Sequence, residues 1–156
     1  MKKVLAGFIV VLVLGFMGEV FAAGSCVKST VEKVNVANGK AFRQYITLTC
    51  TGDGTIAAYS FVPSTEGVKG WYLYNVTTDP DGTSAPTADY DITLVVGGED
   101  IAGGKLANRS DTATQTVAIA PTTQGYYMAD GTMVITFANE TASPSIIVMK
   151  LRFTTE

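Results

Sequence analysis

Apolar and polar residues alternate through most of this chain, and this pattern predicts short β-strands rather than helices. Residues 27–36 alternate in this way, and residues 41–49 continue the pattern after a brief polar interruption. Asn38-Gly39 lies between the two segments and is a strong hairpin signal, because both residues tolerate a positive φ. The sequence therefore predicts a β-hairpin near the N-terminus.

Further strand segments follow, rich in β-branched and aromatic residues and separated by glycine, proline or acidic turn residues. They cover residues 56–62, 71–76, 90–96, 112–119, 132–138 and 145–154, with a local pairing expected at 125–128. The stretches expected to be loops or irregular are 64–70, 79–88, 97–110 and 139–144. No segment after residue 22 has convincing helical periodicity. About eight short antiparallel strands are typical of one all-β domain. We assign residues 23–156 to a single β-sandwich, Greek-key or jelly-roll-like.

One strand segment is unusually aromatic and supplies a candidate contact surface. On strict alternation Trp71 shares one face with Leu73, whereas Tyr72 shares the opposite face with Tyr74. One face is expected to enter the core and the other to stay exposed. Tyr90 completes the candidate group, although the alternation of its own strand turns it inward.

The first 22 residues have the three parts of a secretory signal peptide. A basic start, Met1-Lys2-Lys3, precedes an apolar run over residues 4–18, and Val20 and Ala22 occupy the minus-three and minus-one positions of a cleavage site. The run is shorter than the roughly 20 residues of a comfortable membrane span. We therefore expect cleavage after Ala22 and export to the periplasm, the cell surface or the medium. A retained N-terminal anchor helix is the alternative.

The chain has two cysteines, Cys26 and Cys50, and in an exported protein they predict a structural disulfide. A turn centred on Asn38-Gly39 places them nearly opposite each other, and a one-residue bulge would complete the match. A bridge closing a loop of this length is worth about 3 kcal/mol in the chain-entropy model. Lipidation of Cys26 is an alternative fate, although Ala23 stands where such sites usually have leucine.

Charge and composition exclude several classes of function. The formal net charge is −3, and removing residues 1–22, which hold Lys2, Lys3 and Glu19, makes it −4. An acidic surface argues against nucleic acid and anionic membranes as partners. The chain has no histidine, which removes the Ser-His-Asp and Cys-His forms of catalysis and histidine-based zinc and copper sites.

The acidic residues give weak chemical signals. Asp79 and Asp81 with Gly82 resemble part of a calcium loop, but the glycine comes too early and the other ligands are missing, so a turn is expected. A carboxylate pair such as Asp89 and Asp91 would be needed for a glycosidase-like hydrolase. Carboxylates beside strands are usually solubilising charges, so we expect no enzyme, no metal and no cofactor.

Four segments resemble a group of small tailed-phage virion proteins of the head-decoration or tail-associated type. They are residues 70–74, 86–94, 103–110 and 146–153, and the resemblance covers roughly residues 42–154. It implies a virion component that binds rather than catalyses. An export signal and a cysteine pair are departures, because phage proteins assemble in the cytoplasm.

The segments that resemble the phage proteins lead to three further structural expectations. Gly103 and Gly104 would adopt backbone angles that a side chain forbids. Arg109 would form a surface salt bridge with Asp111 or with an acidic strand edge. The apolar strand at 145–153, if it lay at a sheet edge, would be a template for pairing with another chain.

Together these features predict a non-enzymatic structural or adhesive protein. We expect it to assemble through its sheet surface with itself, as a homo-oligomer, or into a larger capsid, filament or cell-surface structure. The alternative is a secreted carbohydrate-binding module that uses exposed aromatic residues, with a glycan as its partner. The two hypotheses differ in what the exposed sheet surface contacts.

Overall fold

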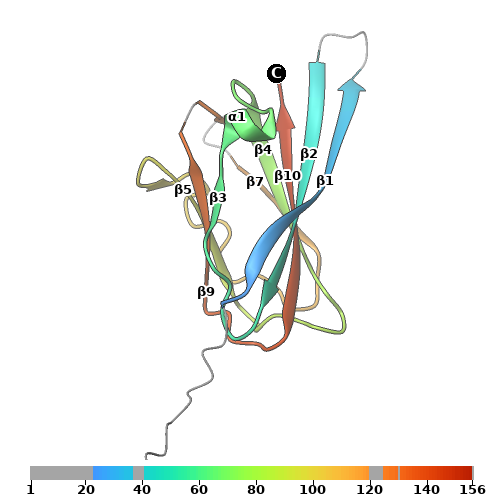
Figure 1. Cartoon of the computed structure of the whole chain (residues 1–156), viewed down its shortest axis with the longest axis vertical. Coiled ribbons are helices and arrows are strands. Elements are labelled where there is room, and N and C mark those ends of the chain that lie inside the picture. The colour runs from blue at the N-terminus through green and yellow to red at the C-terminus, as the bar shows by residue number, and fades with distance from the viewer. Residues whose placement is uncertain (1–22, 37–40, 120–124, 130, 156) are drawn as a thin grey trace, which may run out of the picture.

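The computed structural model describes residues 23–36, 41–119, 125–129 and 131–155 (Figure 1). Nearly all of its regular structure is strand. The elements are β1 (Ser25–Val36), β2 (Ala41–Gly52), β3 (Tyr59–Phe61), α1 (Pro63–Glu66), β4 (Tyr72–Pro80), β5 (Asp91–Val96), β6 (Glu99–Asp100), β7 (Gln115–Ala118), β8 (Tyr126–Tyr127), β9 (Met133–Ala138) and β10 (Ser145–Thr154). Within these ranges no helix is long and apolar enough to cross a bilayer.

The strands form two antiparallel sheets, which confirms the predicted all-β sandwich. The larger sheet has the order β1-β2-β10-β4-β7, and β8 also pairs with β4. The smaller sheet has the order β3-β9-β5-β6. Figure 1 shows the two layers side by side, with the β1–β2 end of the larger sheet standing clear of the smaller one.

The core fills the space between the two layers. β10 supplies one inward row, in which Ile147, Met149, Leu151 and Phe153 are all fully buried. The ring of Phe153 stacks on Phe61 of the opposite sheet, with 5.5 Å between ring centroids. This contact joins the two layers through their largest apolar side chains.

The N-terminal hairpin has the predicted register and the predicted disulfide. Cys26 lies directly opposite Cys50, and the register shifts by one residue between Lys28 and Thr30, which is the expected bulge. The Asn38-Gly39 turn and the signal segment, residues 1–22, lie outside the described residues.

Several strand boundaries differ from the prediction. The loop expected at 64–70 begins with α1, a single helical turn too short to produce a periodic pattern. β4 continues to Pro80, into the loop expected at 79–88, because it pairs there with β10. β8 pairs with β4, which is distant in sequence, rather than locally.

The terminal strand is central, so the condition under which it would be a pairing edge is not met. β10 lies between β2 and β4, and its backbone is paired along both sides. The larger sheet instead ends at β1, a strand of twelve residues. The edge-pairing argument therefore moves from the last strand of the chain to the first.

Arg109 is buried and does not form the expected surface salt bridge. Only 4% of the residue is exposed, and its Nε and Nη2 donate hydrogen bonds of 3.1 and 2.9 Å to Thr78 Oγ1. None of the described carboxylates lies within salt-bridge distance of it. Burial lowers the pKa of the guanidinium. The preceding segment does turn on Gly103 and Gly104 with positive φ, as predicted.

Candidate functional site

The outer face of the larger sheet carries an ordered array of aromatic and cationic side chains. Strand register aligns them in rows. One row contains Glu32, Tyr45, Arg152 and Asn75, in that order across β1, β2, β10 and β4. The next row contains Val34, Arg43, Thr154, Tyr72 and Tyr127. Tyr74 lies between the rows, where the β4–β10 register shifts.

Arg152 is the centre of this array. Its Cζ atom lies 5.0 Å from the centroid of the Tyr74 ring and 5.8 Å from that of Tyr45. A guanidinium this close to aromatic faces is attracted by the ring quadrupoles, which fixes its orientation. Its Nε is buried and has no hydrogen-bond partner in the described part of the chain.

A small polar hollow opens beside Arg152. Its volume is about 130 Å³, and it is lined by Arg43, Tyr74, Arg152 and Thr154. Within the described residues neither guanidinium has a carboxylate within 4.0 Å. Two guanidinium groups thus share one hollow without a counterion from the described part of the chain.

The structure resolves which aromatic residues of the predicted group are exposed. Tyr72 and Tyr74 face outward, and 37% of Tyr74 is exposed. Trp71 is half-buried and packs against the core that contains Leu73, and Tyr90 is fully buried. The inward alternation of the strand at 90–96 explains the burial of Tyr90.

Tyr127 belongs to the exposed aromatic surface, although the sequence analysis did not include it. Its ring lies 5.3 Å from that of Tyr72 with the planes tilted by 59°, and 52% of the residue is exposed. The adjacent tyrosines at 126–127 could be recognised in the sequence as a short aromatic segment. Their pairing with β4 could not be predicted, because β8 and β4 are far apart in the sequence.

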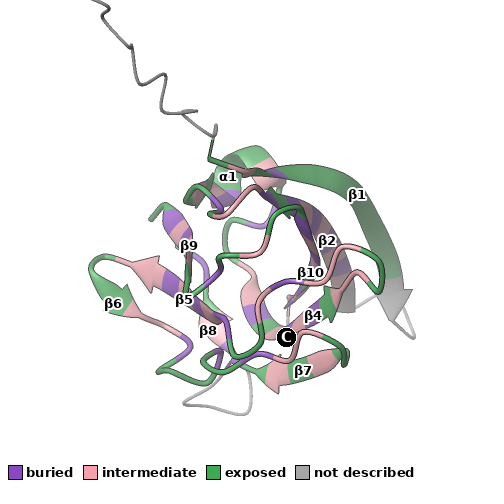
Figure 2. Cartoon of the chain, turned by 90° about the horizontal axis from the view of Figure 1, so that it is seen from below, coloured by how far each residue is buried: buried purple, intermediate pink, exposed green. Residues whose placement is uncertain are grey.

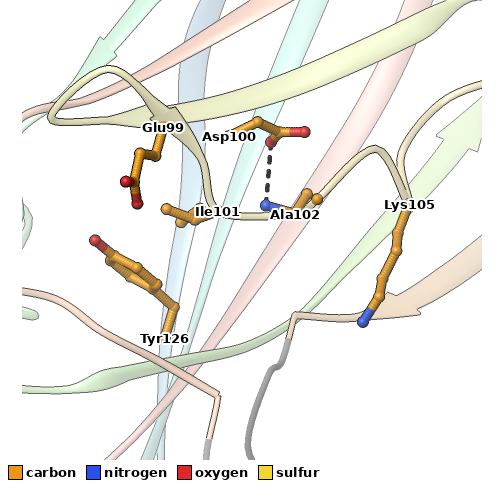
Figure 3. Close-up of a pocket in the computed structure, with 7 residues that line it drawn as sticks. Glu99, Asp100, Ile101, Ala102, Lys105 and Tyr126 are labelled. Carbon is orange, nitrogen blue, oxygen red and sulfur yellow. Dashed lines mark hydrogen bonds between the residues drawn. The ribbon is translucent and has the colours of Figure 1, made fainter.

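A second hollow, of about 270 Å³, lies beside β6 and the turn that follows it (Figure 3). Glu99, Asp100, Lys105 and Tyr126 contribute to its lining. The carboxylate of Asp100 accepts hydrogen bonds from three backbone N–H groups, those of Gly104, Ala102 and Leu94. Asp100 therefore holds the turn in place. Its carboxylate is occupied by these hydrogen bonds and is not a free acid or base in the hollow.

Of the two carboxylates named in the hydrolase hypothesis, that of Asp91 also serves the fold. Asp91 accepts hydrogen bonds from Asn108 N at 2.8 Å and from Asn139 Nδ2 at 2.7 Å, and Asp89 occupies a turn position with a φ of 60°. Across the described ranges no group of three or more His, Cys, Asp or Glu residues is placed to hold a metal ion.

The calcium-like segment is a turn built around Asp81, and it should make stability depend on pH. Hydrogen bonds from Ser84 N and Thr83 N hold the pKa of Asp81 below its usual value. A lowered folded-state pKa stabilises the fold above the unfolded-state pKa, about 4, and this contribution is lost as the pH falls through the folded-state value. Asp81→Ala should therefore unfold more easily than the unmodified protein at pH 7, and the difference should shrink as the pH falls through the folded-state pKa of Asp81.

Urea unfolding at several pH values measures this effect. Asp111→Ala is the control, because within the described chain the Asp111 carboxylate has no hydrogen-bond partner. A stability difference for Asp81→Ala that stays constant across the pH range would contradict the assignment.

β1 is the other unusual surface feature. Figure 2 shows this strand exposed along most of its described length. Val27, Val31 and Val34 are exposed by 59%, 43% and 45%. By register Val31 shares a face with buried Ile46, whereas Val34 shares the outer face with Arg43. Apolar side chains therefore stand on both faces of a free sheet edge.

Comparisons with known proteins give a limited result. No family model matches the chain, and no curated protein sequence matches it. Among solved structures, the fold is similar to a chain described as "Cyanophage Pam1 capsid asymmetric unit", with a TM-score of 0.43 and 14% sequence identity. The match covers 82% of this chain and 94% of that chain.

Proposed function

We propose that this protein is a non-enzymatic structural component that assembles, through the free edge of β1, with further copies of itself and into a larger extracellular or virion structure. The observation that carries this proposal is β1 itself, a strand of twelve residues at the end of the larger sheet. Its exposed valines lie beside backbone groups that, among the described strands, pair with β2 alone.

An edge of this kind is normally protected. Natural sheets shorten their edge strands, cover them, or place charges and prolines on them, because an open edge pairs with other strands. β1 carries Lys28, Glu32 and Lys33, and Lys28 is paired with Glu66 of α1 at 2.7 Å. Beside these charges, Val27, Val31 and Val34 leave exposed apolar positions along the edge. They favour strand addition, in which backbone hydrogen bonds join two chains.

A charge on this edge should prevent assembly without unfolding the protein. Val31→Lys adds a cation at an exposed position outside the core, so we expect it to weaken self-association by about tenfold or more, or about 1.4 kcal/mol. Sedimentation equilibrium of the oxidised protein measures the change, and circular dichroism checks the fold.

The control adds the same charge to the opposite edge of the same sheet. Ala118 is exposed on β7, so Ala118→Lys should leave self-association unchanged. An unmodified protein that stays monomeric at about 100 µM and joins no larger particle would refute the proposal. Its Kd for self-association would then lie above about 100 µM, which is too weak for a stable assembly.

Export is part of the same proposal. A disulfide between Cys26 and Cys50 suits an oxidising compartment. We propose that residues 1–22 are a signal peptide removed after Ala22 and that the sandwich, residues 23–156, is the mature protein. Intact mass measurement of protein from the native host should give a chain that begins at Ala23 and lacks two thiol hydrogens. A mass beginning at Met1 would make the segment an anchor instead.

A second candidate function is glycan binding by the outer face of the larger sheet. The specific observation is the Tyr72–Tyr127 pair, whose rings lie 5.3 Å apart at the surface. Exposed tyrosines offer flat apolar rings with a polar hydroxyl, which suits sugar rings. This function uses a different surface from the β1 edge, so both can operate in one molecule.

A further inference from the structure

We infer that the hollow between Arg43 and Arg152 binds the carboxylate of an acidic sugar, whose ring lies against Tyr72 and Tyr127. This inference rests on the glycan-binding function proposed above and names its ligand class. The hollow and the tyrosine pair lie side by side, because Arg43, Thr154, Tyr72 and Tyr127 form one row across β2, β10, β4 and β8.

The charge of the hollow suits an anion. Arg43 and Arg152 both line it, and within the described chain neither is paired with a carboxylate. This is unusual in a protein with 14 acidic and 11 basic residues. Guanidinium groups bind carboxylates through two parallel hydrogen bonds, and the partnerless Nε of Arg152 is a donor of the required kind.

The hollow is also preorganised for a ligand, because the Arg152 side chain is already held in place. Contacts with the Tyr74 and Tyr45 rings fix the Arg152 guanidinium, so little side-chain freedom is lost when an anion binds. A volume of about 130 Å³ accommodates a carboxylate with part of a sugar ring, but not a whole oligosaccharide. The rest of the ligand must lie along the neighbouring surface.

That neighbouring surface favours a sugar over a peptide. The hollow lies over β10, a central strand whose backbone is already paired on both sides, so a peptide cannot add here as a strand. What the surface offers instead is exposed aromatic rings, those of Tyr74 and Tyr127. Aromatic faces beside a fixed cationic pair match a ring-shaped ligand that carries one carboxylate.

The test compares acidic sugars with their own methyl esters, which keep the ring and remove the charge. Oligogalacturonate, a hyaluronan oligosaccharide and sialyllactose are titrated into the full oxidised protein by calorimetry, each beside its methyl ester. We expect at least one acid to bind and its ester to bind about tenfold more weakly or not at all. Arg43→Gln and Tyr127→Ala should each weaken binding of the acid about tenfold, with the fold checked by circular dichroism.

Lys150→Gln is the matched control, because Lys150 is an exposed cation on β10 that does not line the hollow. Its affinity for the acid should stay within about twofold of the unmodified protein. Equal losses for Lys150→Gln and Arg43→Gln would show nonspecific charge attraction and overturn the inference. Equal binding of acid and ester would overturn the carboxylate site but leave glycan binding standing. Failure of every sugar would remove both, and poly-L-glutamate binding as tightly as the sugars would assign the hollow to a protein partner instead.

Discussion

Replacing Phe153 with alanine should lower the free energy of unfolding by about 3–5 kcal/mol, the usual cost of removing a buried phenylalanine side chain. Phe153 is fully buried and stacks on Phe61 at 5.5 Å, so its loss opens a cavity between the two sheets. The central position of β10 leaves the surrounding backbone little freedom to close that cavity. Urea unfolding followed by tryptophan fluorescence gives the free energy directly.

The control lies on the same strand but on its other face. Val148 is half-buried on the outer face, so Val148→Ala should cost less, about 0.5–1 kcal/mol. Equal losses for the two variants would mean that Phe153 does not join the sheets, and the assignment of the core would be wrong.

Removing the disulfide should be the next largest effect. The bridge joins Cys26 to Cys50 across a separation of 24 residues. Closing a loop of this length reduces the conformational entropy of the unfolded chain, which stabilises the fold by about 3 kcal/mol. The double variant Cys26→Ala with Cys50→Ala should therefore lose about 3 kcal/mol relative to the oxidised protein. Urea unfolding of both proteins measures the loss.

Local measurements separate this effect from a general loss of packing. Among the described strands β1 pairs with β2 alone, so hydrogen exchange in the variant should rise in β1 well before it rises in β10. Adding a reducing agent to the double variant should change nothing, because the chain then has no cysteine left. If the double variant were as stable as the oxidised protein, the Cys26–Cys50 disulfide would contribute nothing to the free energy of unfolding, and the prediction would be wrong.

Alternation alone predicted the parts of the fold in which one face is buried. In residues 90–96 the apolar side chains repeat at every second position, and Tyr90, Ile92 and Leu94 all reach the core. The hairpin register was also predictable, because the separation of Cys26 and Cys50 fits one turn and one bulge. These features depend on neighbours in sequence or on a strict period of two.

The features that failed depend on which strands become neighbours in space. Alternation marked Val27 and Val34 as apolar positions of a strand, but it could not show that this strand would be the exposed edge. The central place of β10 and the burial of Arg109 have the same origin, since pairing order between distant segments leaves no periodic trace. The Arg43–Arg152 hollow was missed for this reason, because its residues come from strands more than 100 positions apart in the sequence.

The position of β10 also determines when the domain can form during synthesis. A nascent chain that has left the ribosome only as far as β9 contains β2 and β4, but the strand that lies between them has not yet been made. Both would then present open backbone edges, and the apolar row that ends in Phe153 would be missing from the core. Folding of this sandwich must therefore follow translation of residues 145–154. Until then the nascent chain stays unfolded, and a chaperone that binds extended chains can bind it throughout that time.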